Sequence, residues 1–85
     1  MSAASKEEIR LWIKQGKAMK ATHVIIVCDT YDYDDYPVFV QEGQTPEKVA
    51  QAYSKDMQRV MEVYSLTGKH DIESQLNERR AHHYD

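Results

Sequence analysis

The feature that most restricts the fold is an unbroken apolar run, Val24-Ile25-Ile26-Val27, between His23 and Cys28. Val and Ile are β-branched and favour extended backbone. A run with no polar alternation is typical of a strand that is buried on both faces. The sequence therefore predicts a central strand over His23–Cys28. Because the chain has only 85 residues, its small core has to be built around that strand.

A second strand is predicted over Tyr36–Val40, where alternate residues from Tyr36 onward share one face. Pro37 has no N–H to donate to a neighbouring strand, so this strand belongs at the edge of a sheet. The segment between the two strands, roughly Thr30–Asp35, then makes the connection of a hairpin.

A first helix is predicted over about Lys6–Met19, because Ser5 and Glu8 have the spacing of a capping box. Apolar residues recur along it at helical spacing, and Trp12 is expected to be its main anchor. Gly16 lies inside this helix and weakens it by about 1 kcal/mol relative to alanine. Alternatively, Gly16 allows the helix to pack closely on a sheet.

Two further helices are indicated by their start signals. Thr45 followed by a proline at the first helical position predicts a helix over Pro46–Lys55. Asp71 is placed to cap a last short helix that ends at about Ala81. The four residues after it, 82–85, are expected to fray.

The segment Gln58–Leu66 fits either a strand or a continuation of the preceding helix. As a strand, it would place Val60 and Tyr64 on one face and Met61 and Val63 on the other. An isolated two-stranded hairpin is marginal in water, and a third strand stabilises it. We therefore predict a strand here, lying antiparallel beside the central one.

These elements predict one α+β domain over residues 1–85, with chain order α-β-β-α-β-α. The three strands form an antiparallel sheet in the order 2-1-3, and the helices lie mainly on one face, with both long helices together there. Apolar residues on an uncovered sheet face usually mark an interface. This arrangement favours a homo-oligomer, most simply a two-fold dimer.

Composition argues against several classes of function. Eleven Lys and Arg against fourteen Asp and Glu give a net charge of −3, and no basic block is present. Nucleic-acid binding needs a clustered basic face, so it is not expected. The longest apolar run is far shorter than the roughly 20 residues of a membrane span. A charged N-terminal segment and a single cysteine, Cys28, predict a soluble cytoplasmic protein.

The hairpin connection is rich in aspartate and tyrosine. The predicted binding contacts are Tyr31, Asp32, Tyr33, Asp34, Asp35 and Tyr36. Tyrosine is enriched at interfaces because it supplies a broad amphipathic surface at low entropic cost. Aspartate is common in turns, where its carboxylate bonds nearby backbone N–H groups. We therefore expect the tyrosines to make contacts and the aspartates to shape and solvate the turn.

The acidic residues also allow a metal-dependent hydrolase that would use Asp29 and Asp32. The spacing lacks the pattern of a calcium-binding loop, and Tyr31 stands where phosphotransfer enzymes need a second aspartate. The terminal His82 and His83 point about 100° apart on a helix and rarely share one ion. We therefore expect no metal, no cofactor and no catalytic residue. Beside His82 and His83, the other candidate ligands for a transition metal are His70 and Asp85, since imidazole suits zinc, copper and nickel.

Arg79 and Arg80 could hold an anion or contact a second subunit, since arginine binds phosphate and carboxylate in bidentate fashion. Together with the tyrosines they would allow an oligomeric protein that binds a nucleotide or metabolite where subunits meet. Cys28 is expected to be a buried structural residue, because the adjacent Asp29 discourages its thiolate.

Four segments, ATHVIIVCDT, DYPVFV, MQRVMEVYSL and ESQLNERRAHHYD, follow one another along the chain. In this order they resemble a group of small uncharacterised proteins from bacteria and their phages. The resemblance runs from Trp12 to the end and includes no catalytic motif. It implies a self-contained domain of phage or prophage origin and assigns no functional residue. We expect a small non-enzymatic binding or regulatory protein, whose partner is another protein or a second copy of itself.

Overall fold

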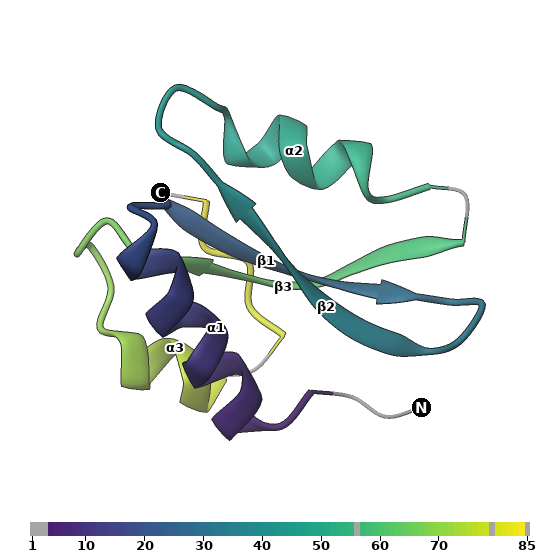
Figure 1. The fold of residues 1–85 in the computed structure, drawn as a ribbon, viewed down its shortest axis with the longest axis horizontal. Coiled ribbons are helices and arrows are strands. Elements are labelled where there is room, and N and C mark those ends of the chain that lie inside the picture. The colour runs from purple at the N-terminus through teal and green to yellow at the C-terminus, as the bar shows by residue number, and fades with distance from the viewer. Residues whose placement is uncertain (1–3, 56, 79, 85) are drawn as a thin grey trace.

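The computed structural model describes residues 4–55, 57–78 and 80–84, which form the helices and strands labelled in Figure 1. In chain order the elements are α1 (Lys6–Ala18), β1 (His23–Asp29), β2 (Asp34–Val40), α2 (Pro46–Ala52), β3 (Gln58–Ser65) and α3 (Ile72–Glu78). The strands make one antiparallel sheet in the order β2-β1-β3. The predicted α+β class, the chain order and the strand order are confirmed. None of the described helices is both long and apolar enough to cross a membrane.

The segment that fitted both a helix and a strand is β3. Its register with β1 shifts by one residue near the middle, which leaves Met61 as the extra residue of a β-bulge. Because of the bulge, Val60 lies on the same side as Val63, and Met61 lies on the same side as Tyr64. The predicted faces of Val60 and Met61 were therefore wrong, since simple alternation does not include an inserted residue.

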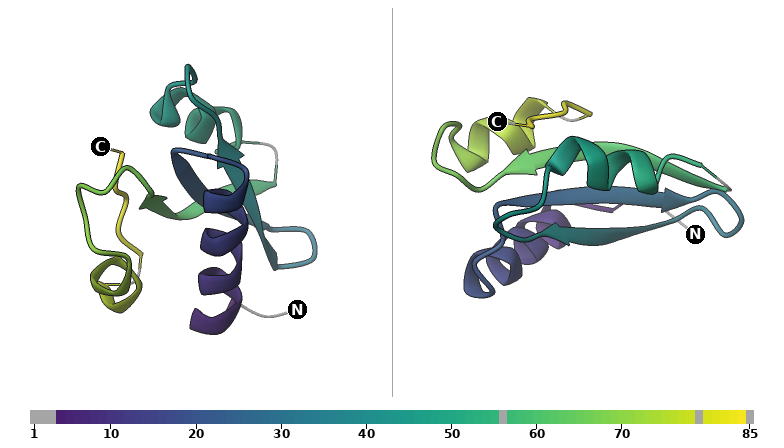
Figure 2. Two further views of the ribbon diagram at one scale, coloured as in Figure 1. Left: turned by 60° about the vertical axis from the view of Figure 1, so that its left-hand side comes forward. Right: turned by 90° about the horizontal axis from the view of Figure 1, so that it is seen from above.

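The helices divide between the two faces of the sheet, so the prediction that both long helices share a face was wrong. Figure 2 shows α1 and α3 on one side and α2 on the other. Parallel strands joined by a helix almost always make a right-handed crossover. The strands β2 and β3 are parallel, because each is antiparallel to β1. The handedness of their connection, rather than the apolar pattern of α2, therefore selects the face that α2 covers.

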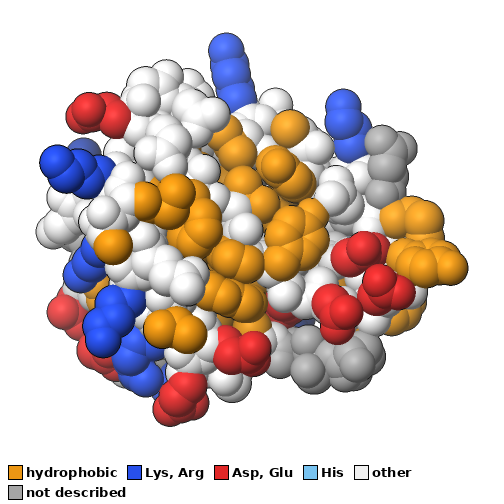
Figure 3. Space-filling view, in the orientation of Figure 1, with side chains coloured by type: hydrophobic (Ala, Val, Ile, Leu, Met, Phe, Trp, Pro, Cys, Tyr) orange, Lys and Arg blue, Asp and Glu red, His pale blue; other side chains and the backbone are white. Residues whose placement is uncertain are grey.

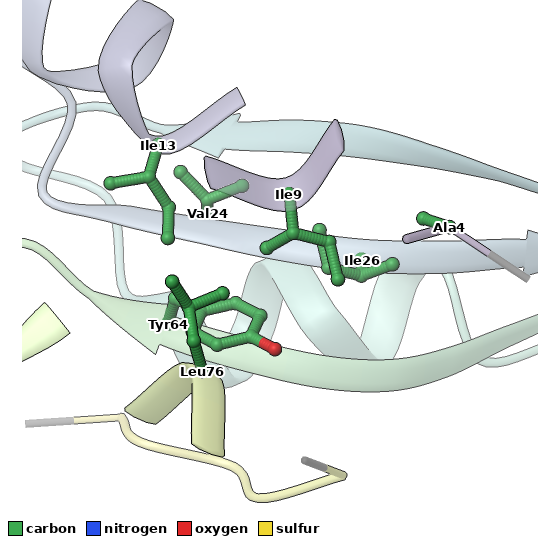
Figure 4. Close-up of a cluster of buried hydrophobic side chains, with 7 residues drawn as sticks. All are labelled: Ala4, Ile9, Ile13, Val24, Ile26, Tyr64 and Leu76. Carbon is green, nitrogen blue, oxygen red and sulfur yellow. The ribbon is translucent and has the colours of Figure 1, made fainter. Parts of the chain in front are cut away.

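The first face carries a cluster of buried side chains contributed by the segment before α1, by α1 and α3, and by two strands. Its members are Ala4, Ile9, Ile13, Val24, Ile26, Tyr64 and Leu76 (Figure 4). Trp12, the expected anchor of α1, packs against this cluster but is only partly buried. The main anchors of α1 are instead Ile9 and Ile13, which are 1% and 3% exposed.

The second face, which the sequence left uncovered, also has a buried cluster. It consists of Ile25, Val27, Val40, Ala50 and Val63, with partly buried side chains that include Tyr36, Val38, Tyr53 and Tyr84. Tyr36, Val38 and Val40 share this face, as predicted. Because α2 and Tyr84 cover it, an uncovered sheet face no longer supports an oligomer.

The start of α1 and its packing follow the sequence closely. Ser5 accepts a hydrogen bond from the Glu8 amide at 3.2 Å, and Glu8 accepts one from the Ser5 amide at 3.1 Å, so the capping box is present. Gly16 is buried against the sheet. A methyl group there would come within 3.0 Å of side-chain atoms of Val24 and Leu66. Gly16 therefore allows close packing of α1.

The outer edge of β3 is closed by α3 and the C-terminal segment. The amide N–H of Ser65 donates to the Gln75 side chain at 2.7 Å, and the Ser65 carbonyl accepts from it at 2.9 Å. Two residues earlier, Val63 donates to the Ala81 carbonyl and accepts from the His83 amide, both at 3.0 Å. The described C-terminal residues are thus paired with β3 instead of frayed. Exposed strand edges promote unwanted pairing, and this edge is covered.

Several predicted boundaries are corrected by one to three residues. β2 begins at Asp34 instead of Tyr36, and the turn is correspondingly shorter. α2 ends at Ala52 instead of Lys55. α3 ends at Glu78 instead of Ala81, because the chain must leave the helix for residue 82 to pair with Val63.

Candidate functional site

The hairpin between β1 and β2 turns through residues 30–33, and Asp29 organises this turn. Its carboxylate Oδ1 accepts a hydrogen bond from the Tyr31 amide at 2.8 Å. Its carbonyl accepts one from the Tyr33 amide, and Tyr33 has a φ of 60°, in the left-handed region. An aspartate that bonds the backbone two residues further on is a common turn former. The turn therefore holds its tyrosines in a defined conformation.

Four of the six predicted contact residues are exposed together at this end of the sheet. Tyr31 and Tyr33 are 74% and 58% exposed. Asp32 and Asp34 are also exposed, and Asp34 lies directly opposite Asp29 in the register of the two strands. Like charges that face each other across strands are destabilising. The acidic character of this end is therefore maintained at some cost in stability.

The other two predicted residues have structural roles. Asp35 is half-buried, and its Oδ2 accepts a hydrogen bond from the Ala4 amide at 2.9 Å, which ties the segment before α1 to the sheet. Tyr36 packs in the second core cluster, and its hydroxyl accepts from Gln58 Nε2 at 2.6 Å. Burial raises the pKa of the Tyr36 phenol. Neither side chain is presented for contact in the way that the tip tyrosines are.

Met57 belongs to the same surface and was not predicted as a contact residue. It is 57% exposed and precedes β3, and its carbonyl accepts a hydrogen bond from the Thr30 amide at 2.7 Å. That bond places Met57 next to the hairpin turn. The sequence offered one signal, an apolar residue beside the polar start of a strand, but only the sheet order brings it to the hairpin.

We call this region the hairpin-end surface and define it as Tyr31, Asp32, Tyr33, Asp34 and Met57. Figure 3 shows hydrophobic and acidic side chains gathered at the right-hand end of the molecule, where the hairpin of Figure 1 lies. Among the described residues, the exposed large hydrophobic side chains are Leu11, Met19, Tyr31, Tyr33 and Met57. Three of these five belong to the hairpin-end surface.

The geometry gives no support to a hydrolase built on Asp29 and Asp32, because Asp29 is engaged in the turn. Within the parts of the chain that the structure describes, no three His, Cys, Asp or Glu side chains are grouped to hold a metal ion. The rings of His70 and His83 lie 4.4 Å apart, and His83 Nε2 contacts Glu78 Oε1 at 2.8 Å. These contacts hold the C-terminal segment against α3 and the loop before it.

Of the predicted arginine pair, one residue lies in the described part of the chain. Arg79 lies outside the described residues. Arg80 is exposed and is not in a helix, and it has a φ of 58°. Its backbone N–H donates to Glu62 Oε2 at 2.8 Å, so its main chain helps to hold the C-terminal segment. In the described part of the chain, no hydrogen bond or ion pair joins Arg80 to the hairpin-end surface of the same copy.

Cys28 lies at the end of β1 and is half-buried, not fully buried as predicted. Burial raises the pKa of its thiol, and the nearby carboxylates of Asp35 and Asp29 raise it further. The predicted influence of Asp29 is present, but Asp35, which faces Cys28 across the strands, contributes more. A thiol with a raised pKa has little thiolate at neutral pH and is a poor nucleophile.

Alkylation of Cys28 by iodoacetamide is therefore expected to be slower in the folded protein than in the same chain unfolded in urea. Its pH profile should be displaced to higher pH, because the folded thiol loses its proton at a higher pH. Mass spectrometry of quenched samples across a pH series measures both profiles. Equal rates with coincident profiles would contradict this assignment. The Asp35→Asn variant should move the folded profile part of the way back.

Comparison of the chain with protein-family models, with curated proteins and with solved structures gives no match.

Proposed function

We propose that this chain is a small non-enzymatic binding protein that acts by contacting a protein partner through the hairpin-end surface. The observation that carries the proposal is the concentration of exposed apolar side chains there: Tyr31, Tyr33 and Met57 are each more than half exposed. Exposed apolar side chains that gather on one surface usually mark an interaction site. Tyrosine and methionine are both enriched at protein interfaces.

The hydrogen bonds that order the turn favour a binding surface over a turn that is only solvated. The turn is held by two hydrogen bonds that Asp29 accepts from the amides of Tyr31 and Tyr33, and the Met57 carbonyl accepts one from Thr30. A contact surface that is already ordered loses less conformational entropy when a partner binds. The exposed Asp32 and Asp34 add charge at the rim, which favours a partner with basic side chains beside an apolar patch.

The proposal also covers the biological role and the cellular location of the protein. A phage- or prophage-related regulatory role is supported by the resemblance of its segments to small bacterial and phage proteins. A cytoplasmic location is supported by the single cysteine, which fits a reducing compartment. The partner is another protein or a second copy of this chain.

Site-specific photo-crosslinking in the cells that naturally produce the protein tests the proposal. A photoreactive phenylalanine analogue at position 31 or 33 should give one dominant protein adduct. The same analogue at position 51, which is exposed on α2 on the covered face of the sheet, should not. Identical adduct patterns from all three positions would refute a specific role for the hairpin-end surface. Because the replaced side chains are exposed, the free energy of unfolding of each variant should lie within about 0.5 kcal/mol of that of the unmodified protein.

A further inference from the structure

A second surface, far from the hairpin, has complementary properties. It is a cleft of about 440 Å³ between α1 and the first turn of α3. Its lining residues are Glu7, Arg10, Leu11, Ile13, Lys14, Lys17, Ile72 and Glu73. We call it the α1–α3 cleft. In Figure 1 the two helices lie at the left of the molecule, at the opposite end from the hairpin.

The apolar part of the cleft is open to solvent. Leu11 forms part of the wall and is 54% exposed, whereas Ile13 at the floor is buried and Ile72 is half-buried. An exposed leucine on its own is ordinary, but here it adjoins two further apolar side chains in a concave surface. The cleft can therefore receive an apolar or aromatic group.

The charged part of the cleft has a net positive surplus toward the end of α1. Arg10 is already neutralised, because its guanidinium contacts both carboxylate oxygens of Glu73, at 2.8 and 3.1 Å. This pairing raises the pKa of Arg10 and lowers the pKa of Glu73. Lys14 and Lys17 are exposed and make no ion pair with any residue that the structure describes. They present two unneutralised positive charges beside the apolar floor.

The hairpin-end surface offers the counterpart of each feature. It presents two tyrosines and a methionine for the apolar floor, and two exposed carboxylates for the two lysines. Figure 3 shows Lys and Arg side chains at the lower left, with acidic side chains among them, and a group of acidic side chains at the hairpin end. Complementary charge of this kind selects partners and aligns them.

We infer that the partner of the hairpin-end surface is a second copy of this chain, which receives the hairpin in its α1–α3 cleft. The inference rests on the proposed function and names its partner. Tyr31 and Tyr33 pack against Leu11 and Ile72, while Asp32 and Asp34 approach Lys14 and Lys17.

The two surfaces are different and lie at opposite ends of each copy, so the contact is head-to-tail. A head-to-tail contact leaves one free hairpin and one free cleft at the ends of any open assembly. Association therefore continues into a closed ring or an open chain, and it does not stop at the two-fold dimer that the sequence suggested. Because the contact is partly ionic and lies at the surface, it weakens as the salt concentration rises.

Charge reversal tests the inference by sedimentation velocity over a concentration series at low salt. Asp32→Lys with Asp34→Lys reverses the hairpin, and Lys14→Glu with Lys17→Glu reverses the cleft. Each double variant alone should associate on the order of tenfold more weakly than the wild type. An equimolar mixture of the two should regain association, because each contact between one variant and the other joins opposite charges. Lys48→Glu on α2 is the matched control and should associate like the wild type.

Circular dichroism of each variant should match that of the wild type, which would show that the helices and the sheet are retained. Recovery of association in the mixture would show independently that both variants are folded. A wild-type protein that remains monomeric throughout the series overturns the inference. So does association that survives either reversal, or a mixture that fails to associate. If self-association fails while positions 31 and 33 still crosslink to a different protein, the proposed function stands and only the identity of the partner is wrong.

Discussion

Replacing Gln75 with methionine is expected to lower the free energy of unfolding by about 3 kcal/mol. Gln75 is 1% exposed, and its side-chain amide both donates to and accepts from the backbone of Ser65. Methionine has a similar length but cannot make either bond. Two buried backbone groups would then lack partners, and each such group costs about 1–3 kcal/mol. The loss is large for a protein of this size, whose total stability is only about 5–15 kcal/mol.

Urea unfolding followed by circular dichroism measures the effect. Gln51→Met is the matched control, because Gln51 is exposed on α2 and the same change there should cost less than about 0.5 kcal/mol. A loss below about 1 kcal/mol for Gln75→Met would mean that water enters the site and satisfies Ser65. Amide hydrogen exchange at Ser65 tests the bond to Gln75 independently of stability. The Ser65 amide should exchange much faster in Gln75→Met than in the wild type, because it no longer donates to the Gln75 side chain.

Replacing Gly16 with valine is expected to destabilise the protein by about 2–3 kcal/mol. Even the first carbon of a side chain at this position would lie 3.0 Å from atoms of Val24 and Leu66 and 3.3 Å from Phe39. Valine adds two more carbons, which have no space unless α1 moves away from the sheet. That movement would loosen the packing of Ile9 and Ile13, the main anchors of α1.

Two related variants separate crowding from helix propensity. Gly16→Ala should change stability by less than about 1 kcal/mol, because the gain in helix propensity opposes the tighter contact. Lys17→Val places the same β-branched side chain at the exposed neighbouring position, where it costs about 0.5 kcal/mol in helix propensity. It also removes the basic residue in the last turn of α1, which stabilises the helix dipole by about 0.3–1 kcal/mol. If Gly16→Val were no more destabilising than Lys17→Val, the close approach of α1 to the sheet would be disproved.

Local sequence signals were sufficient wherever one segment decides its own conformation. The Val and Ile run became the central strand, and the Ser5–Glu8 capping box began α1. Pro37 marked β2 as an edge strand, which the sheet order confirms. These predictions succeeded because β-branching, capping and the missing proline N–H act within a few residues of the backbone.

The candidate site was predicted only in part, because its members come from more than one segment. Tyr31 and Tyr33 could be found from composition, since they interrupt an acidic turn between two strands. Tyr36 was predicted with them but packs into the core, because it lies inside β2 on the face covered by α2. Met57 was missed, because only the pairing of β3 with β1 brings it to the hairpin.

The sequence by itself determined the α+β class, the order of the elements and the sheet order, since these follow from periodicity, caps and the need of a hairpin for a third strand. Only the tertiary structure decided which face α2 covers, the bulge at Met61 and the closure of the β3 edge by Gln75. Each of these depends on partners distant along the chain: the handedness of a crossover, the register between two strands, and buried backbone groups at Ser65 that must find a hydrogen bond. The same is true of the two complementary surfaces, whose opposite placement no single segment contains.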